Sequence, residues 1–258
     1  MEKNIDDIRR YWDRQPCNVN HSTQPQGSRQ YFDEVETKKL TVEPHIVAFS
    51  EFEKYRGQRV LEVGCGIGTA GINFARYDVL YTGVELSQVS LDLAKRRFEV
   101  YGVEGDFYQG NAENLDQFLP AQTFDMIYCW GVVHHTPRPE LVIKQMSQYL
   151  DSGGELKLMV YARNSWKNFM IEAGLDQPEA QWGCPIANVY SNQEITDLLD
   201  PYFEVEKICQ DHIFPWEVSN YKQGVLVKES WFAHMPPAVF AALERNLGWH
   251  LMVTARRK

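Results

Sequence analysis

Hydrophobic and polar positions in the middle of the chain form short apolar runs separated by longer segments. The runs occur at 60–63, 79–84, 124–130 and 155–160. Runs of this kind predict parallel strands that are covered on both faces. The segments between them predict helices, including one over 88–100 that Ser87 caps. Residues 58–160 therefore alternate strand and helix, as a doubly wound α/β sheet requires.

The flanking regions follow a different pattern. Residues 1–57 predict helices around a loop-like stretch, with a helix that begins at Glu43-Pro44-His45 and ends at Gly57. A polar and aromatic insertion covers 161–190, and a helix start and two further strands follow it. We therefore expect an N-terminal helical lid segment over 1–57, followed by a main domain over 58–258 that carries the insertion.

The first apolar run leads directly into a glycine turn. Gly64, Gly66 and Gly68 stand at alternate positions, and a helix is expected to begin near Thr69. Glycines let the backbone turn tightly and approach a ligand, and a helix start points free N–H groups at it. The spacing differs from the G-x-G-x-x-G of dinucleotide-binding loops, and the Gly-Lys-Ser/Thr ending of a phosphate-binding P-loop is absent. The pattern predicts a nucleotide-cofactor loop of another kind.

Two acidic residues accompany this loop. Glu62 lies inside the strand, and Glu85 ends the next strand, 21 residues after Gly64. A carboxylate at that place can accept hydrogen bonds from both hydroxyls of a ribose. The alternative for Glu85 is an ordinary solvated carboxylate at a strand end.

The segment Glu62-Val63-Gly64-Cys65-Gly66-Ile67-Gly68 resembles the first motif of the class I S-adenosylmethionine-dependent methyltransferases. The resemblance covers 58–160 and, more weakly, the last two strands. It implies a Rossmann-like, seven-stranded sheet, mostly parallel, in which the final strand inserts antiparallel beside the sixth. It also implies S-adenosyl-L-methionine as cofactor.

The resemblance assigns further residues to the cofactor. Those expected to bind it are Glu62, Gly64, Gly66, Gly68, Glu85, Leu86, Asn111, Ala112 and Trp130. Asn111 and Ala112 occupy the places that flank the adenine in this family. An ordinary helix or turn cap is the alternative for Asn111.

The run at 124–130 continues through Gly131 to a pair of histidines and Pro137, which resembles the family's fourth motif. His134 and His135 are the leading candidates for a general base, because a histidine titrates near neutral pH. The alternative is that one or both cap the loop or pack beneath the adenine.

Other polar and aromatic residues are weaker candidates for contact with the substrate. They are Tyr11, His21, Tyr161, Arg163 and Trp166, with Phe169 and Trp182 as further walls of the pocket. Arg163 could hold a carboxylate, although a surface role is an equal alternative. The neighbours Asp211 and His212 could form an acid–base pair, but adjacent residues on an extended segment usually point apart.

Composition narrows the partners. The 258 residues carry a net charge of −9 with a pI near 5.3, which argues against a nucleic-acid substrate. Aromatic residues make up 13% of the chain, which favours a chamber for a small molecule. No stretch is apolar enough to predict a membrane span or a secretory signal. The five scattered cysteines lack metal-ligand spacing, so we expect no metal site and a reducing, cytoplasmic location.

These features predict an enzyme that transfers a methyl group from S-adenosylmethionine to a small molecule. A nicotinamide-dependent oxidoreductase and a non-catalytic or regulatory cofactor-binding protein are the alternatives. Transfer to arsenic is a variant of the first hypothesis, because Cys17, Cys184 and Cys209 could supply thiolates for a soft metalloid. The acceptor atom and the oligomeric state stay open.

Overall fold

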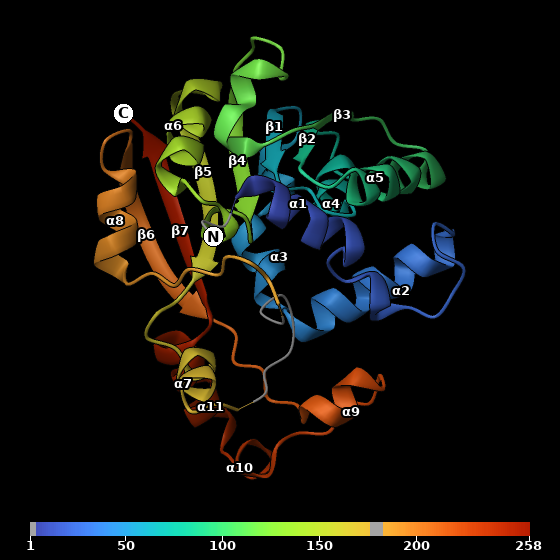
Figure 1. The fold of residues 1–258 in the computed structure, drawn as a ribbon, viewed down its shortest axis with the longest axis vertical. Coiled ribbons are helices and arrows are strands. Elements are labelled where there is room, and N and C mark those ends of the chain that lie inside the picture. The colour runs from blue at the N-terminus through green and yellow to red at the C-terminus, as the bar shows by residue number, and fades with distance from the viewer. Residues whose placement is uncertain (1–3, 176–182) are drawn as a thin grey trace.

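A computed structural model describes residues 4–175 and 183–258. Within them, seven strands form one sheet in the order β3-β2-β1-β4-β5-β7-β6 (Figure 1). The strands are β1 (Arg59–Val63), β2 (Leu80–Glu85), β3 (Asp106–Gln109), β4 (Phe124–Trp130), β5 (Leu150–Tyr161), β6 (Phe203–Asp211) and β7 (His250–Arg257).

Strand direction agrees with the predicted topology. Neighbouring strands from β3 to β5 pair in parallel. The exception is β7, which lies between β5 and β6 and pairs antiparallel with both. The predicted fold class, a mostly parallel seven-stranded Rossmann-like sheet with one antiparallel strand, is therefore confirmed.

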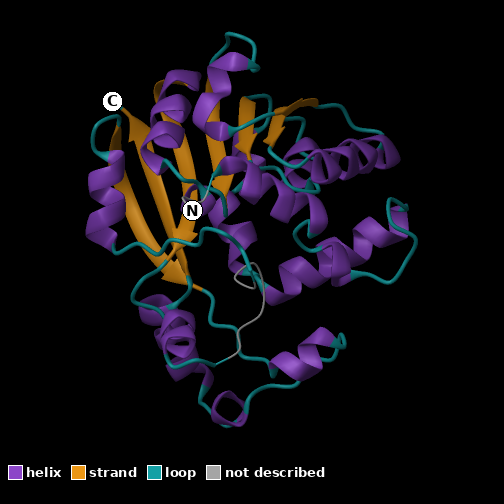
Figure 2. Ribbon diagram, in the orientation of Figure 1, coloured by secondary structure: helices purple, strands orange, loops and turns teal. Residues whose placement is uncertain are grey.

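Helices lie beside the sheet and beyond the ends of its strands (Figure 2). The α-helices are α1 (Ile5–Arg14), α2 (Arg29–Val42), α3 (His45–Ser50), α4 (Thr69–Ala75), α5 (Gln88–Tyr101), α6 (Pro139–Tyr149), α7 (Trp166–Glu172), α8 (Asn192–Leu199), α9 (Val218–Lys222), α10 (Ser230–Ala233) and α11 (Pro237–Leu247). The 3₁₀ turns are η1 (Val19–His21), η2 (Phe52–Tyr55), η3 (Ala112–Gln117) and η4 (Val133–His135).

Both faces of the sheet are covered, as the apolar runs predict. Alternate residues of β1 and β4 point to opposite sides, so Leu61 and Ile127 join one apolar cluster while Val60 and Met126 join another. The first cluster includes residues of α6 and α8, and the second includes residues of α4 and α5. Burial on both faces is what holds the ends of β1, β2 and β4 in fixed positions.

The helix predicted from Glu43 to Gly57 is wrong in one respect. It is divided into α3 and η2 at Glu51, whose φ of 48° lies in the left-handed region. A left-handed residue cannot continue a right-handed helix. The break turns the Glu51 carboxylate toward Lys157 of β5, with which it forms an ion pair.

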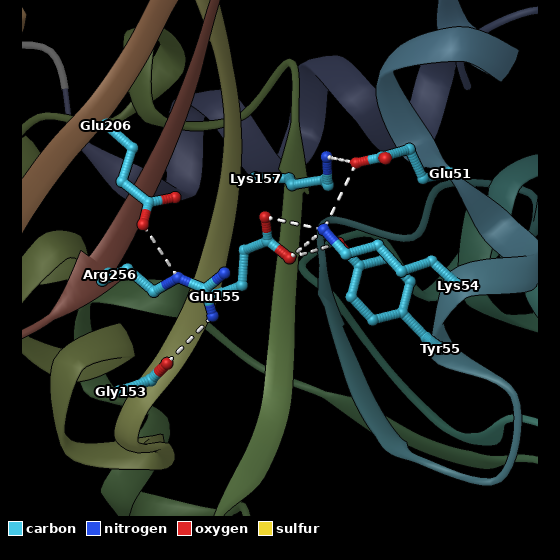
Figure 3. A network of polar contacts seen from close by, with 8 residues as sticks. All are labelled: Glu51, Lys54, Tyr55, Gly153, Glu155, Lys157, Glu206 and Arg256. Carbon is cyan, nitrogen blue, oxygen red and sulfur yellow. Dashed lines mark hydrogen bonds and ion pairs between the residues drawn. The ribbon is translucent and has the colours of Figure 1, made fainter.

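Figure 3 shows the polar contacts that hold η2 against β5. The Glu155 carboxylate accepts hydrogen bonds from Lys54 Nζ at 2.8 Å and from Tyr55 Oη at 2.7 Å. Burial acts to raise the pKa of Glu155, but the bonds from Lys54 and Tyr55 outweigh it, so the pKa is lowered. Part of the predicted lid segment is thus attached to the main sheet through a fully bonded carboxylate.

Candidate functional site

A cavity opens at the carboxyl ends of the parallel strands, where ligands of doubly wound sheets bind. It encloses about 1480 Å³, including the part open to solvent. Its wall includes the loop after β1, the ends of β2, β4 and β5, and the first residue of β7. Residues of α1 and α2 complete it, so the N-terminal segment contributes to the same cavity.

The loop after β1 lies at one end, which we call the glycine-loop end. Gly64 has a φ of 79°, and its N–H donates to the Val84 carbonyl at 2.8 Å. A Cβ on Gly64 would lie 2.1 Å from a methyl of Val132. Gly68, with a φ of 77°, is the N-cap of α4. Glycine is therefore required at these two positions for the turn and for close approach.

Glu85 lies at the same end, at the tip of β2, and its side chain is buried. Its carboxylate accepts backbone hydrogen bonds from Gly66 and Ser87, each at 2.9 Å. Burial raises the pKa of Glu85 although these donors oppose the shift. A carboxylate has about four acceptor sites, so acceptor capacity remains for the hydroxyls of a ribose.

Glu62 also lines the cavity and is buried. It accepts a hydrogen bond from Tyr81 Oη at 2.6 Å. Burial raises the pKa of Glu62 to about 8, and the nearby Glu85 adds to the rise. The side chain is therefore largely protonated at neutral pH in the protein alone.

Leu86, Asn111 and Ala112 lie in the wall beside Glu85. The Asn111 side chain accepts from the backbone N–H of Glu113 at 3.0 Å and caps η3. The cap that was the alternative for Asn111 is therefore formed, and the residue also faces the cavity. Trp130, at the end of β4, lines the cavity and stacks on Tyr128 with 6.0 Å between ring centroids.

The two histidines after β4 differ in position. His135 lines the cavity, and its Nδ1 lies 2.6 Å from the Ile186 carbonyl oxygen. Burial lowers the pKa of His135 to about 4, so its imidazole is neutral at pH 7. His134 is fully buried, does not line the cavity, and packs on the Tyr161 ring with 3.7 Å between centroids. Within the described chain neither ring nitrogen of His134 has a hydrogen-bond partner.

The weaker substrate candidates are dispersed. Tyr161 lines the cavity, whereas Tyr11, His21, Arg163 and Trp166 are not in its wall. Arg163 Nη2 pairs with Glu194 at 2.8 Å, the surface role given as its alternative.

His21 Nε2 lies 3.2 Å from Tyr221 Oη, and the Trp166 ring packs edge-on against the Phe232 ring. The Phe169 side chain is exposed, and Trp182 lies outside the described residues.

Two further hypotheses about side-chain pairs can be compared with the geometry. Asp211 accepts a hydrogen bond from the backbone N–H of His212 at 2.7 Å. Among the cysteines, Cys17 lines the cavity and Cys184 Sγ lies 3.3 Å from His135 Nδ1. Both cysteines thus belong to the neighbourhood of the cavity, while Cys209 lies in β6.

Another part of the cavity wall, which we call the histidine end, contains residues that sequence reasoning missed. Glu43 and His250 line it, and His45 Nε2 lies 2.8 Å from His250 Nδ1. Lys39 Nζ pairs with Glu43 Oε1 at 2.6 Å. Burial lowers the pKa of His45 to about 2 and that of His250 well below its usual value, so both imidazoles are uncharged at pH 7. His45 and His250 are 205 residues apart, and no local spacing could have indicated the group.

The sequence comparisons match the part of the chain that contains the glycine loop. Residues 60–154 match a family described as a methyltransferase domain. This central part of the chain is therefore similar in sequence to methyltransferase domains. Over 109 residues it is 32% identical to a ubiquinone biosynthesis O-methyltransferase of Coxiella burnetii, and over 108 residues 31% identical to one of Pseudomonas aeruginosa. Each match covers 42% of this chain and 46% of the relative, so the chain spans about half the length of the curated relatives it matches.

Solved structures share the fold over nearly the whole chain. Magnesium protoporphyrin IX methyltransferase from Synechocystis, with bound S-adenosylmethionine, has a TM-score of 0.61 at 15% identity and covers 99% of this chain and 98% of its own. The cyclase SpnF has a TM-score of 0.60 at 17% identity and covers 98% of this chain and 97% of its own. The methyltransferase fold therefore also occurs in a protein named for another reaction, and the fold alone does not define the chemistry.

Among the described helices, none combines the length and the apolar character that a bilayer crossing needs.

Proposed function

We propose that this chain transfers a methyl group from S-adenosylmethionine to a small-molecule acceptor. One observation supports the proposal above all: the glycine loop and Glu85 share a single cavity with Trp130, His135 and Tyr161.

The residues at the glycine-loop end fit this cofactor. Glu85 would accept hydrogen bonds from the ribose hydroxyls, and Leu86, Asn111 and Ala112 would flank the adenine. The loop itself would contact the amino-acid portion, with no side chain at Gly64 to block it. When bound, S-adenosylmethionine supplies a methyl group that is already activated on a sulfonium sulfur.

The protein's own task is then to align the acceptor and exclude water, and positioning of this kind can supply roughly 7–11 kcal/mol. We assign the proton-accepting role to His135 because its side chain faces the cavity. Its lowered pKa of about 4 leaves the imidazole unprotonated at pH 7 and makes it a weaker base than an ordinary histidine. We propose that His134, buried against Tyr161, supports that wall. A base is needed only for an acceptor that starts protonated.

The proposal includes an acceptor that is a small molecule and not a nucleic acid, in line with the net charge of −9. The lid would include the described residues of 1–57, since Ile5, Ile8 and Trp12 line the cavity. The insertion over 161–190 stays a prediction as its second part, and its residues 176–182 lie outside the described residues. A reducing, cytoplasmic location stays a prediction, based on the scattered positions of the five cysteines along the chain.

Calorimetric titration of the purified chain with S-adenosylmethionine, S-adenosylhomocysteine and NAD tests the cofactor. We expect binding of the two sulfur cofactors and none of NAD, followed by label incorporation in a screen of acceptors with labelled methyl groups. His135→Gln should then lower turnover roughly 100-fold with little change in cofactor affinity. His234→Ala, an exposed histidine on another element, is the matched control.

A second candidate is a protein that binds the cofactor without transferring its methyl group. The fold shared with the cyclase SpnF favours keeping it. Tight binding of both sulfur cofactors without label transfer to any acceptor would select this candidate. Selective binding of NAD would instead select the nicotinamide-dependent oxidoreductase.

A further inference from the structure

The histidine end contains three side chains arranged as metal ligands. Glu43, His45 and His250 each offer one ligand atom, and these atoms all lie within 4.8 Å of one another. On one tetrahedral ion with bonds of about 2.0–2.2 Å, neighbouring ligand atoms are about 3.3–3.6 Å apart. The observed separations are 2.8 Å from His45 Nε2 to His250 Nδ1 and 3.9 Å from His250 Nδ1 to Glu43 Oε2. Small side-chain movements would therefore bring all three atoms onto one ion.

Glu43 gives a second, independent indication of a ligand. Its side chain is only 1% exposed, yet Oε2 has no hydrogen-bond partner within the described residues. A buried carboxylate oxygen without a donor is unfavourable. Lys39 occupies Oε1 and leaves Oε2 directed at the imidazoles. The Glu155 carboxylate of Figure 3, which accepts bonds at both oxygens, shows how this chain completes a purely structural group.

We propose that Glu43, His45 and His250 bind a divalent first-row transition ion such as Zn²⁺ or Fe²⁺. Two neutral imidazoles and one carboxylate are the ligand set of catalytic zinc sites and of non-haem iron sites, both of which keep coordination positions open. Because Glu43 and His250 line the cavity, the open positions face the space for the acceptor. This proposal differs from the expectation of no metal site, which was drawn from cysteine spacing; its ligands would come from α3, the residue pair before it, and β7.

The ion also defines a class of acceptor, an inference that rests on the proposed methyl transfer. The charges of Glu43 and Lys39 cancel, so a bound divalent ion would give the site a net charge of two positive units. This charge favours an anionic oxygen or sulfur ligand. A bound hydroxyl or thiol would lose its proton to the proposed base, His135, more readily. Its lone pair would form the new bond to the methyl carbon as the carbon–sulfur bond breaks, and that electron pair would stay on the sulfur.

Titration of the chelator-treated full chain with Co²⁺, followed by visible absorption, tests the site without any activity. We expect one Co²⁺ per chain, and at least about 100-fold weaker binding in Glu43→Gln, His45→Ala and His250→Ala, because loss of even an outer partner weakens metal affinity 10–100-fold. His234→Ala should bind as the wild type does. Absence of binding in the folded wild type, or equal binding by all variants, would overturn the proposal.

If a variant fails to fold, the metal site can still be tested on the wild-type protein. Stoichiometric Zn²⁺ should raise its Tm and block chemical modification of His45, measured by mass spectrometry, while exposed His234 still reacts. An unchanged Tm and unprotected His45 would refute the site. Calorimetry with S-adenosylmethionine in the same samples separates the two proposals, since either ligand can bind while the other fails.

Discussion

The two ends of the cavity differ in the groups that form them: a backbone turn at one end, and side chains from distant parts of the chain at the other. At the glycine-loop end, Gly64 and Gly66 come from one turn, and the Glu85 carboxylate is bonded to backbone N–H groups nearby. At the histidine end, Glu43 and His250 meet as side chains from remote parts of the chain, and one carboxylate oxygen has no donor in the described structure. A backbone loop can recognise one constant cofactor, whereas a set of side chains can be altered to suit one acceptor.

The largest effect should come from Glu85→Ala. Loss of two charge-assisted hydrogen bonds to a ribose should weaken S-adenosylmethionine binding by about 3 kcal/mol, roughly 100-fold or more. Calorimetry measures this, and Co²⁺ binding at the histidine end should not change. Glu99→Ala, an exposed acid of α5, is the matched control. Unchanged cofactor affinity in folded Glu85→Ala would remove the ribose assignment.

A smaller effect should appear in the pH dependence of stability. The pKa of Glu62 is raised to about 8 in the folded state. The protonated side chain therefore contributes fully to the free energy of unfolding below the unfolded pKa, about 4.3, and this contribution is lost as pH rises through 8. Glu62→Gln cannot titrate, so its free energy of unfolding should fall less between pH 5 and 8, by about 1.4 kcal/mol or more. Urea unfolding without cofactor at both pH values measures this.

Exposed Glu104→Gln is the control for that experiment and should follow the wild type at both pH values. An identical pH dependence in wild type and Glu62→Gln would show that Glu62 is ionised in the folded protein. The glycine-loop end would then carry one more negative charge than the structure indicates.

The smallest effect should come from Arg163→Ala. Arg163 and Glu194 are both about half exposed, and such pairs are worth about 0–1 kcal/mol. The Tm should change little, and the affinities for the cofactor and for Co²⁺ should stay the same. Weaker binding of an identified carboxylate acceptor would instead return Arg163 to the list of substrate residues.

Features that are formed by neighbouring residues of the chain could be predicted from the sequence. The strand before Gly64, the carboxylate at the end of β2 and the insertion of the last strand all follow from runs of neighbouring residues and from the family resemblance. The break at Glu51 could not be predicted, because its ion pair with Lys157 depends on how α3 meets β5. The meeting of His45 with His250 depends on β7 entering between β5 and β6, which no spacing along the chain records.

The place of β7 has a consequence for the order in which the protein forms during translation. β5 pairs with β4 on one edge and with β7 on the other, and in the described sheet β6 pairs only with β7. One edge of β5 and the whole of β6 therefore lack a partner strand until residues 250–257 have left the ribosome. At about 5–20 residues per second, the 38 residues between 211 and 250 delay sheet closure by several seconds. The edge of β5 is exposed to other nascent chains throughout that interval, and the histidine end is among the last parts of the molecule to exist.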